Sequence, residues 1–222
     1  MRPSSHLNKS YNKFLKKSNR LRDDVVKAQS LSFRERDLVL GYTVLQFHNL
    51  WAAYCRTIAL SAYYKANSSS GKTSFSVPAS ARTNCRDLES YIYDFTILCK
   101  PFLAKKNPSP PIQSRLEPAW HNIDILYDGL SWFSYSNING VDAARSFYNG
   151  VTNHVTAARN FYAHKKKDTN EKLVSLVRRE YTVAFSHDEH VTDILFKRPR
   201  GEATPLAVYW IDVVKSGAGL MV

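Results

Sequence analysis

The sequence contains few glycines and cysteines and no long run of apolar residues. Eight glycines in 222 residues, without the strand-and-turn alternation of a β protein, favour helices. The three cysteines form no C-x-x-C pair, which argues against a disulfide framework or a metal site and fits a reducing compartment. No segment approaches the roughly 18 apolar residues of a membrane span, and the N-terminus leads into lysines. We therefore expect no signal peptide, no membrane partner and a cytoplasmic location.

Positive charge is concentrated toward the two ends of the chain. The formal net charge is +12, with ten Lys/Arg against three acidic residues in 1–36 and ten against six in 159–200. The segment 101–158 carries four of each sign. Basic ends around a neutral middle favour a polyanionic partner, most commonly nucleic acid. The alternative is a charged surface that only keeps the protein soluble.

Hydrophobic residues make up 44% of the chain, which is enough for a folded core. Apolar residues at helical spacing predict an all-α protein whose helices cover 5–29, 32–66, 84–99, 119–128, 141–164, 170–184 and 205–215. The first of these is amphipathic and basic. Ser32 and Glu35 form a capping box at the start of the second, and Thr204, Pro205 and Gly217 delimit the last. We expect loops at 67–82 and 105–118, and turns between Ser134 and Gly140.

Near the end of the predicted helix 141–164, the chain reads Arg159-Asn160-Phe161-Tyr162-Ala163-His164. This R-N-x-x-x-H pattern resembles the signature of the HEPN superfamily, in which four to six residues separate an arginine from a histidine and asparagine, aspartate or histidine is favoured directly after the arginine. The resemblance implies a HEPN-like helical bundle over 32–222, with 1–31 as a basic helical extension and the long loops as additions. A second permitted spacing, Arg115 to His121, straddles Pro118 and has no asparagine after the arginine.

The resemblance also implies an activity, that of the metal-independent endoribonucleases that serve prokaryotes as toxins or antiviral-defence effectors. No cofactor would be needed. A histidine can move the protons of the attacking 2′-OH and the leaving 5′-oxygen, which is the role expected of His164. Arg159 would stabilise the phosphate as charge builds, and Asn160 would position it or the imidazole. The expected products are a 2′,3′-cyclic phosphate and a 5′-OH.

Residues around the motif suggest further roles. Asn160 and His164 are four residues apart and share a helix face, whereas Arg159 is rotated by about 140° from His164. That divergence fits a homodimer in which the motifs of two copies meet, and the resemblance to HEPN proteins, which typically form such dimers, implies the same. Lys165, Lys166 and Lys167 are either RNA-phosphate contacts or a solvated run beside a negative helix end. Tyr162 is a candidate modification site, and a toxin would also need an antitoxin or a sensor partner.

Several alternatives remain open at this point. The chain could be a non-catalytic HEPN module that binds RNA, a nucleotide or a partner protein, or a helical scaffold subunit of a larger defence complex. His164 could also simply complement a helix dipole. His154 could border the cleft or pack in the core, and we expect His48 to be buried. We interpret the P-loop-like segment 66–73 as a loop, because a P-loop follows a strand and opens a helix, and neither flank here fits that pattern. We interpret 187–190 as a solvated turn.

Overall fold

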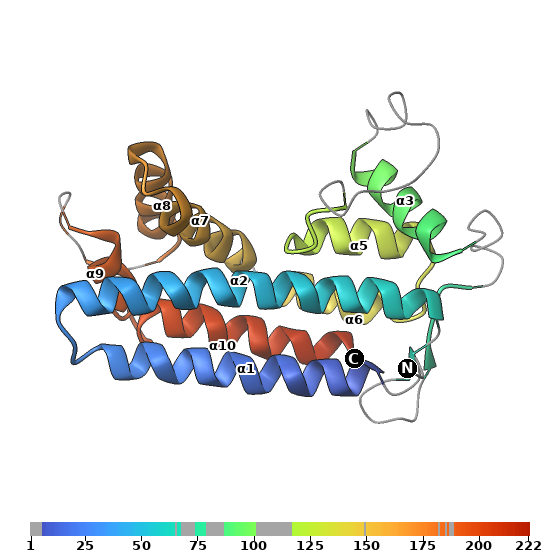
Figure 1. Cartoon of the computed structure of the whole chain (residues 1–222), viewed down its shortest axis with the longest axis horizontal. Coiled ribbons are helices and arrows are strands. Elements are labelled where there is room, and N and C mark those ends of the chain that lie inside the picture. Colours follow the sequence, from blue (N-terminus) through green and yellow to red (C-terminus); the bar gives the residue numbers. More distant parts are fainter. Residues whose placement is uncertain are drawn as a thin grey trace. The chain divides into compact units, whose positions relative to one another are not determined.

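The computed structural model describes residues 6–64, 66–67, 74–78, 87–100, 117–148, 150–181, 183–184, 186 and 189–222. These residues are predominantly helical, which confirms the predicted all-α class (Figure 1). The helices are α1 (His6–Ala28), α2 (Phe33–Tyr64), α3 (Leu88–Cys99), α5 (Ile123–Trp132), α6 (Ile138–Tyr148), α7 (Val151–His164), α8 (Lys167–Glu180), α9 (Val191–Phe196) and α10 (Leu206–Ala218), and a 3-10 turn follows at Gly219–Met221. Among the helices of the described segments, none combines the length and the apolarity needed to cross a bilayer.

The chain divides into two compact units. Unit 1 comprises Met1–Lys13, Ala52–Phe147 and Gly217–Val222, and unit 2 comprises Phe14–Trp51 and Tyr148–Ser216. The predicted boundary after residue 31 does not separate these units, because the second part of α1 and the first part of α2 belong to unit 2 together.

Unit 2 is built around aromatic side chains from α1, α2 and the end of α6. Phe14 lies 6.3 Å from Phe47 and 6.0 Å from Trp51, and Trp51 meets Tyr148 edge-on at 5.3 Å, all between ring centroids. The Arg22 guanidinium donates from Nε to both carboxylate oxygens of Asp212, at 2.9 and 3.0 Å. This core fixes the helices that carry the motif.

The start of α2 shows one half of the predicted capping box, the bond from the Ser32 backbone N–H to the Glu35 side chain. The backbone N–H of Ser32 donates to the Glu35 carboxylate at 3.0 Å, and the Ser32 hydroxyl donates to the same oxygen at 2.6 Å. These bonds lower the pKa of Glu35, because they favour its charged form. Helix α2 therefore begins one residue after Ser32, as the sequence predicted.

Unit 1 has a second core of aromatic side chains. Its helices α3 and α5 begin at other residues than the sequence predicts. Helix α3 begins at Leu88, because the Asp87 side chain accepts from the Ser90 N–H at 2.8 Å and caps it. Helix α5 covers 123–132 rather than 119–128, because Asn122 caps it. Around the predicted loop 67–82, two short strands of two residues each, β1 (Ala66–Asn67) and β2 (Ser74–Phe75), pair antiparallel. Residues 68–73 and 79–82 of this predicted loop lie outside the described part.

The predicted helix 141–164 is in fact two helices. Helix α6 ends at Tyr148, and Gly150, with φ of +83°, precedes α7. An L-residue other than glycine is disfavoured at that φ, so Gly150 allows the chain to turn here. The other ends also shift: α8 begins at Lys167 rather than 170, α6 begins inside the predicted turn, and Gly217 lies within α10 instead of ending it. Helix α9 was not predicted.

The close packing of α5 against α3 leads to a prediction about the stability of the protein. A Cβ placed on Gly129 would lie 2.0 Å from the Phe95 ring. Because the core is close-packed, we expect Gly129→Ala to lower the free energy of unfolding by about 1–3 kcal/mol, the usual effect of overpacking. Urea unfolding measures this. The control Ser131→Ala, at an exposed position of the same helix, should change stability by less than about 0.5 kcal/mol, and an equal effect of both variants would contradict the prediction.

Candidate functional site

The three motif residues lie at the C-terminal end of α7. Arg159 and Asn160 are half-buried, and the Arg159 Nη1 donates to Asn160 Oδ1 at 3.1 Å. His164 is the last residue of the helix and is exposed, and its side chain has no hydrogen bond or ion pair to any described residue. The structure thus joins Arg159 to Asn160 directly, while His164 shares a helix face with Asn160 four residues earlier.

The packing of α7 determines which face carries the motif. Val151, Val155, Ala158 and Tyr162 are buried, and they form the inner stripe that the sequence predicted. Asn153, Ala163 and His164 are exposed on the opposite side, and Asn160 is only half-buried. We call this outward side of α7 the motif face. The exposed His164 imidazole on this face is accessible to a ligand from solvent, while the half-buried Arg159 is rotated by about 140° from it around the helix axis.

Tyr162, within the motif, points the other way. Its ring lies against Gly41, where a Cβ would come within 2.9 Å of the ring. Its hydroxyl lies 2.9 Å from Thr192 Oγ1, and Thr192 donates its own proton to Asp37 Oδ1 at 2.6 Å, so Tyr162 is the donor to Thr192. Burial raises the pKa of the Tyr162 hydroxyl. A modifying enzyme could reach this hydroxyl only after α7 moved away from α2. Modification of Tyr162 stays a prediction.

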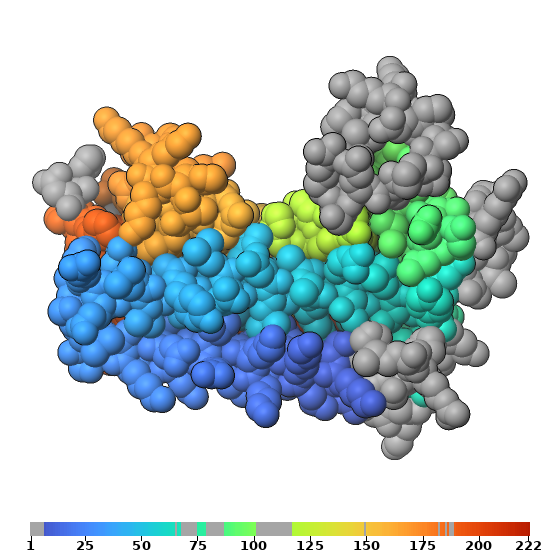
Figure 2. All heavy atoms as spheres, viewed as in Figure 1, coloured from blue at the N-terminus to red at the C-terminus, as the bar shows by residue number. Residues whose placement is uncertain are grey.

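The lysine run joins two helices. Lys165 ends α7 in a left-handed conformation with φ of +48°, Lys166 is the N-cap of α8, and Lys167 is its first residue. All three lysines follow the negative C-terminal end of α7, and Lys166 and Lys167 also lie at the positive N-terminal end of α8. Figure 2 shows the segment that begins with these lysines, in orange, standing out above α2.

Lys165 is held by Asp37 of α2. Its Nζ lies 2.6 Å from Asp37 Oδ2. Burial alone would raise the pKa of the Asp37 carboxyl, but hydrogen bonds from Lys165 and Thr192 and the charge of Lys165 outweigh it, so this pKa lies below its ordinary value. Asp37 thereby links the end of α7 to α2 and α9.

We expect Asp37→Ala to lower the free energy of unfolding by about 1–3 kcal/mol, because it leaves the buried Thr192 hydroxyl without its acceptor. Urea unfolding at neutral pH measures the loss. Glu171→Ala is the control, since among the described residues Glu171 forms only an exposed pair with Lys167 at 3.8 Å, and this pair should contribute less than about 0.5 kcal/mol. A loss no larger than that of the control would show that Asp37 does not tie these helices together.

An open depression lies beside the motif, between the end of α7, the start of α8 and the residues before α9. It measures about 420 Å³ and is lined by Phe161, Lys165, Lys166, Lys167, Asn170, Glu189 and His190. We call it the lysine depression. Neither Arg159 nor His164 lines it. The structure therefore groups the predicted lysines together, but on a different side of α7 from the motif face.

Two other histidines make structural hydrogen bonds, and a third is buried. His154 is buried with its Nδ1 2.7 Å from the Tyr181 hydroxyl, which supports the packing interpretation, and His48 is buried as expected. His190 caps α9, since its Nδ1 accepts from the Thr192 N–H at 3.2 Å. In the described part of the chain, no three His, Cys, Asp or Glu side chains are grouped to hold a metal. Arg115, residues 68–73 of the P-loop-like segment, His187 and Asp188 lie outside the described residues.

Sequence reasoning missed Asp37, Thr192 and His190. The one local signal was the His190-x-Thr192 spacing before an apolar run, which resembles a helix start. In comparisons with known proteins, no family model matches the chain, and neither the curated proteins nor the solved structures give a significant match. The functional argument therefore depends on the residues and geometry of the site itself.

Proposed function

We propose that this protein is a metal-independent endoribonuclease of the HEPN type. The observation that carries the proposal is the R-N-x-x-x-H set at the C-terminal end of α7, with His164 exposed and Arg159 bound to Asn160 at 3.1 Å. The all-α fold is compatible with it. The basic ends of the chain and the lysines beside the motif favour a polyanionic substrate. The same proposal assigns the protein to the cytoplasm.

The chemistry is phosphoryl transfer within the RNA. The 2′-oxygen attacks the adjacent phosphorus and forms the 2′,3′-cyclic phosphate, while the bond to the 5′-oxygen breaks. The His164 imidazole takes the 2′-OH proton or delivers one to the leaving 5′-oxygen. Arg159 binds the non-bridging phosphate oxygens, where negative charge grows. Asn160 orients the Arg159 guanidinium, and Lys166 and Lys167 bind neighbouring phosphates.

A homodimer is part of the proposal. Arg159 and His164 diverge by about 140° around the axis of α7, so one helix does not direct both at one phosphorus. Two copies related by a two-fold axis would place the motif faces opposite each other. The second copy would then supply a second histidine, one for each proton transfer. An antitoxin or sensor protein would restrain the activity by covering this face.

The test is an incubation of the purified full-length chain with total RNA and with tRNA in excess EDTA. Cleavage that leaves 2′,3′-cyclic phosphate ends is the expected result, and light scattering of the same sample should report a dimer. Intact RNA after incubation with a folded dimer would contradict the proposal.

A second candidate function is an RNA-binding module without catalysis. It is favoured by one observation: the lysine depression is lined by neither Arg159 nor His164, so RNA held there need not meet the motif. In that case RNA would bind in EDTA and stay intact, and replacing His164 would change nothing.

A further inference from the structure

The lysine depression has an aromatic side as well as a cationic one. The Phe161 and His190 ring centroids are 6.0 Å apart, and His190 also meets Phe33 edge-on at 5.0 Å. Because the His190 Nδ1 accepts the Thr192 N–H, its remaining nitrogen, Nε2, carries the ring proton of the neutral form and is an N–H donor. The ring is thus fixed by α9 and bordered by two aromatic neighbours.

The charges of the depression are not balanced. Lys165 is paired with Asp37 at 2.6 Å, and the one lining carboxylate, Glu189, is paired with Lys197 at 2.6 Å. Lys166 has no ion pair within the described residues, and the exposed Lys167 lies 3.8 Å from Glu171. Both lysines stand at the positive end of α8, whose N-cap makes no side-chain hydrogen bond. An anion in the depression would be attracted by two ammonium groups and by the helix end together.

The size of the depression fits one nucleotide. Its volume of about 420 Å³ lies in the usual range of small-ligand sites. Cations beside aromatic rings are the combination with which proteins bind single-stranded RNA, the rings stacking on an unpaired base and the cations binding phosphate. A duplex would present its phosphates but would keep its bases stacked internally.

We infer that the lysine depression binds one unpaired nucleotide of a single-stranded RNA, with its phosphate on Lys166 and Lys167 and its base against the exposed ring of His190, which the buried Phe161 supports from below. The Asn170 amide, also on the lining, can donate to or accept from the base edge. This inference rests on the proposed function for the choice of RNA as ligand. Because Phe161 directly follows Asn160 on α7, the depression is a subsite within one helical turn of the motif.

The test measures binding separately from cleavage. Fluorescence anisotropy of a labelled single-stranded RNA of 12 nucleotides and of a matching duplex is recorded with full-length His164→Ala protein, which should not cut the probe. Lys166→Ala/Lys167→Ala should reduce the salt dependence of single-strand binding by about 1.4 in log–log slope. His190→Asn keeps a capping acceptor for α9 and removes the ring, so it should weaken single-strand binding about tenfold and duplex binding much less.

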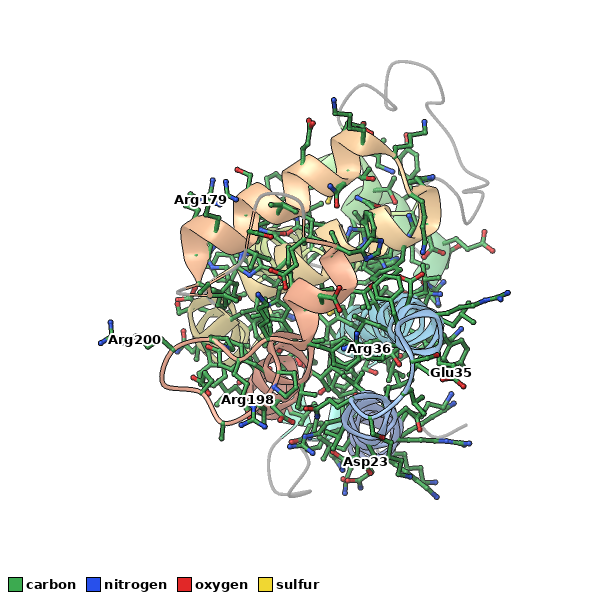
Figure 3. All side chains as sticks on the ribbon, turned by 90° about the vertical axis from the view of Figure 1, so that its left-hand side faces the viewer. Asp23, Glu35, Arg36, Arg179, Arg198 and Arg200 are labelled. Carbon is green, nitrogen blue, oxygen red and sulfur yellow. The ribbon has the colours of Figure 1, made fainter. Side chains whose placement is uncertain are left out.

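The matched control is Arg198→Ala/Arg200→Ala, which removes two exposed cations of unit 2 outside the lysine depression (Figure 3). It should weaken binding clearly less than the double lysine variant. Equal losses in the two double variants, unchanged affinity of a His190→Asn protein that unfolds at the wild-type temperature, or equal weakening for duplex and single strand would each overturn the inference. If the wild type binds through the depression but never cuts, the proposed function fails and the inference stands. If the wild type cuts RNA while these variants bind and cut normally, the proposed function stands and the inference fails.

Discussion

We expect the His164→Ala variant to cleave RNA at least about 100-fold more slowly than the wild-type chain in EDTA, the usual contribution of a general acid or base. His164 is the exposed last residue of α7, so its removal should leave the packing of unit 2 unchanged. For the same reason, free imidazole can reach the vacated position from solvent. Added imidazole should therefore restore part of the rate to His164→Ala.

Arg159 should behave differently from a simple positive charge. We expect a loss of about 100-fold in Arg159→Ala, as when one transition-state donor is removed. Arg159→Lys should recover little, because an ammonium group cannot reproduce the planar guanidinium that binds phosphate oxygens in pairs. Asn160 holds this guanidinium at 3.1 Å, and its replacement should act through Arg159. Initial rates on an end-labelled RNA measure all these variants.

The matched control is His121→Ala, since His121 belongs to the other Arg-to-His spacing in the sequence, with Arg115. It should cleave RNA like the wild type. If His164→Ala and Arg159→Ala also cleave at the wild-type rate, the motif is not the active site. If imidazole fails to restore any activity to His164→Ala while the protein remains folded and dimeric, a role for His164 in proton transfer is contradicted.

Local signals in the sequence were sufficient for the long helices. The apolar spacing of residues 5–29 predicted α1 within one residue at each end, and Ser32 and Glu35 predicted the start of α2, because a capping box acts between neighbouring residues. Asp87 and Asn122 shifted the starts of α3 and α5 for the same kind of reason, since each accepts a backbone N–H at its own position. Those two caps were present in the sequence but were not used to set the boundaries.

The break between α6 and α7 was harder to predict, because the apolar stripe continues through it at helical spacing. The Asn149-Gly150 dipeptide, a common turn signal, marks the break in the sequence, and Gly150 has a positive φ. One consequence concerns Phe147, which would lie on the apolar stripe of a single helix over 141–164 but is 51% exposed. Helix α9 has six residues, too few for a period to be recognised.

The candidate site was predictable only along α7. The spacing of Asn160 and His164 predicts their shared face without any tertiary information. Asp37 reaches Lys165 across 128 residues of sequence and Thr192 across 155, and His190 closes the lysine depression from the segment before α9. Nothing local marks such partners, because they meet only when α2, α7 and α9 pack together. The cationic part of the site was therefore visible in the sequence, and its aromatic and acidic parts were not.

The second large effect that we expect is a loss of stability in mild acid, caused by His154. Its Nδ1 lies 2.7 Å from the Tyr181 hydroxyl, and the Trp210 Nε1–H donates to that hydroxyl at 2.8 Å. Because the indole can only donate, the Tyr181 proton points to Nδ1, and His154 is neutral with its proton on Nε2. Burial lowers the pKa of His154 from 6.5 to about 4, helped by Arg179 and opposed by Glu180.

The sign of the pH dependence follows from this shift. Between about pH 6.5 and 4 the unfolded chain binds a proton at His154 that the folded chain excludes, so acid favours unfolding. The stabilisation is fully present above pH 6.5 and is lost as the pH falls toward 4. A shift from 6.5 to about 4 corresponds to at most about 3 kcal/mol. The Asp37 carboxyl, whose pKa is lowered from 3.8, loses its contribution only below this window.

Urea unfolding of the full chain at pH 7.5, 6, 5 and 4.5 measures the effect. Wild-type stability should fall steadily across this series. His154→Gln keeps an acceptor for Tyr181 but cannot titrate, so it should be less stable than the wild type at pH 7.5 and should approach it at pH 4.5. His164→Gln removes an exposed imidazole from the same helix and should keep the wild-type decline. A decline of equal size in His154→Gln would show that some other group causes the acid sensitivity. If the decline disappears in His154→Gln, the buried contact of His154 with Tyr181 makes the stability of the helix that carries Arg159, Asn160 and His164 depend on pH.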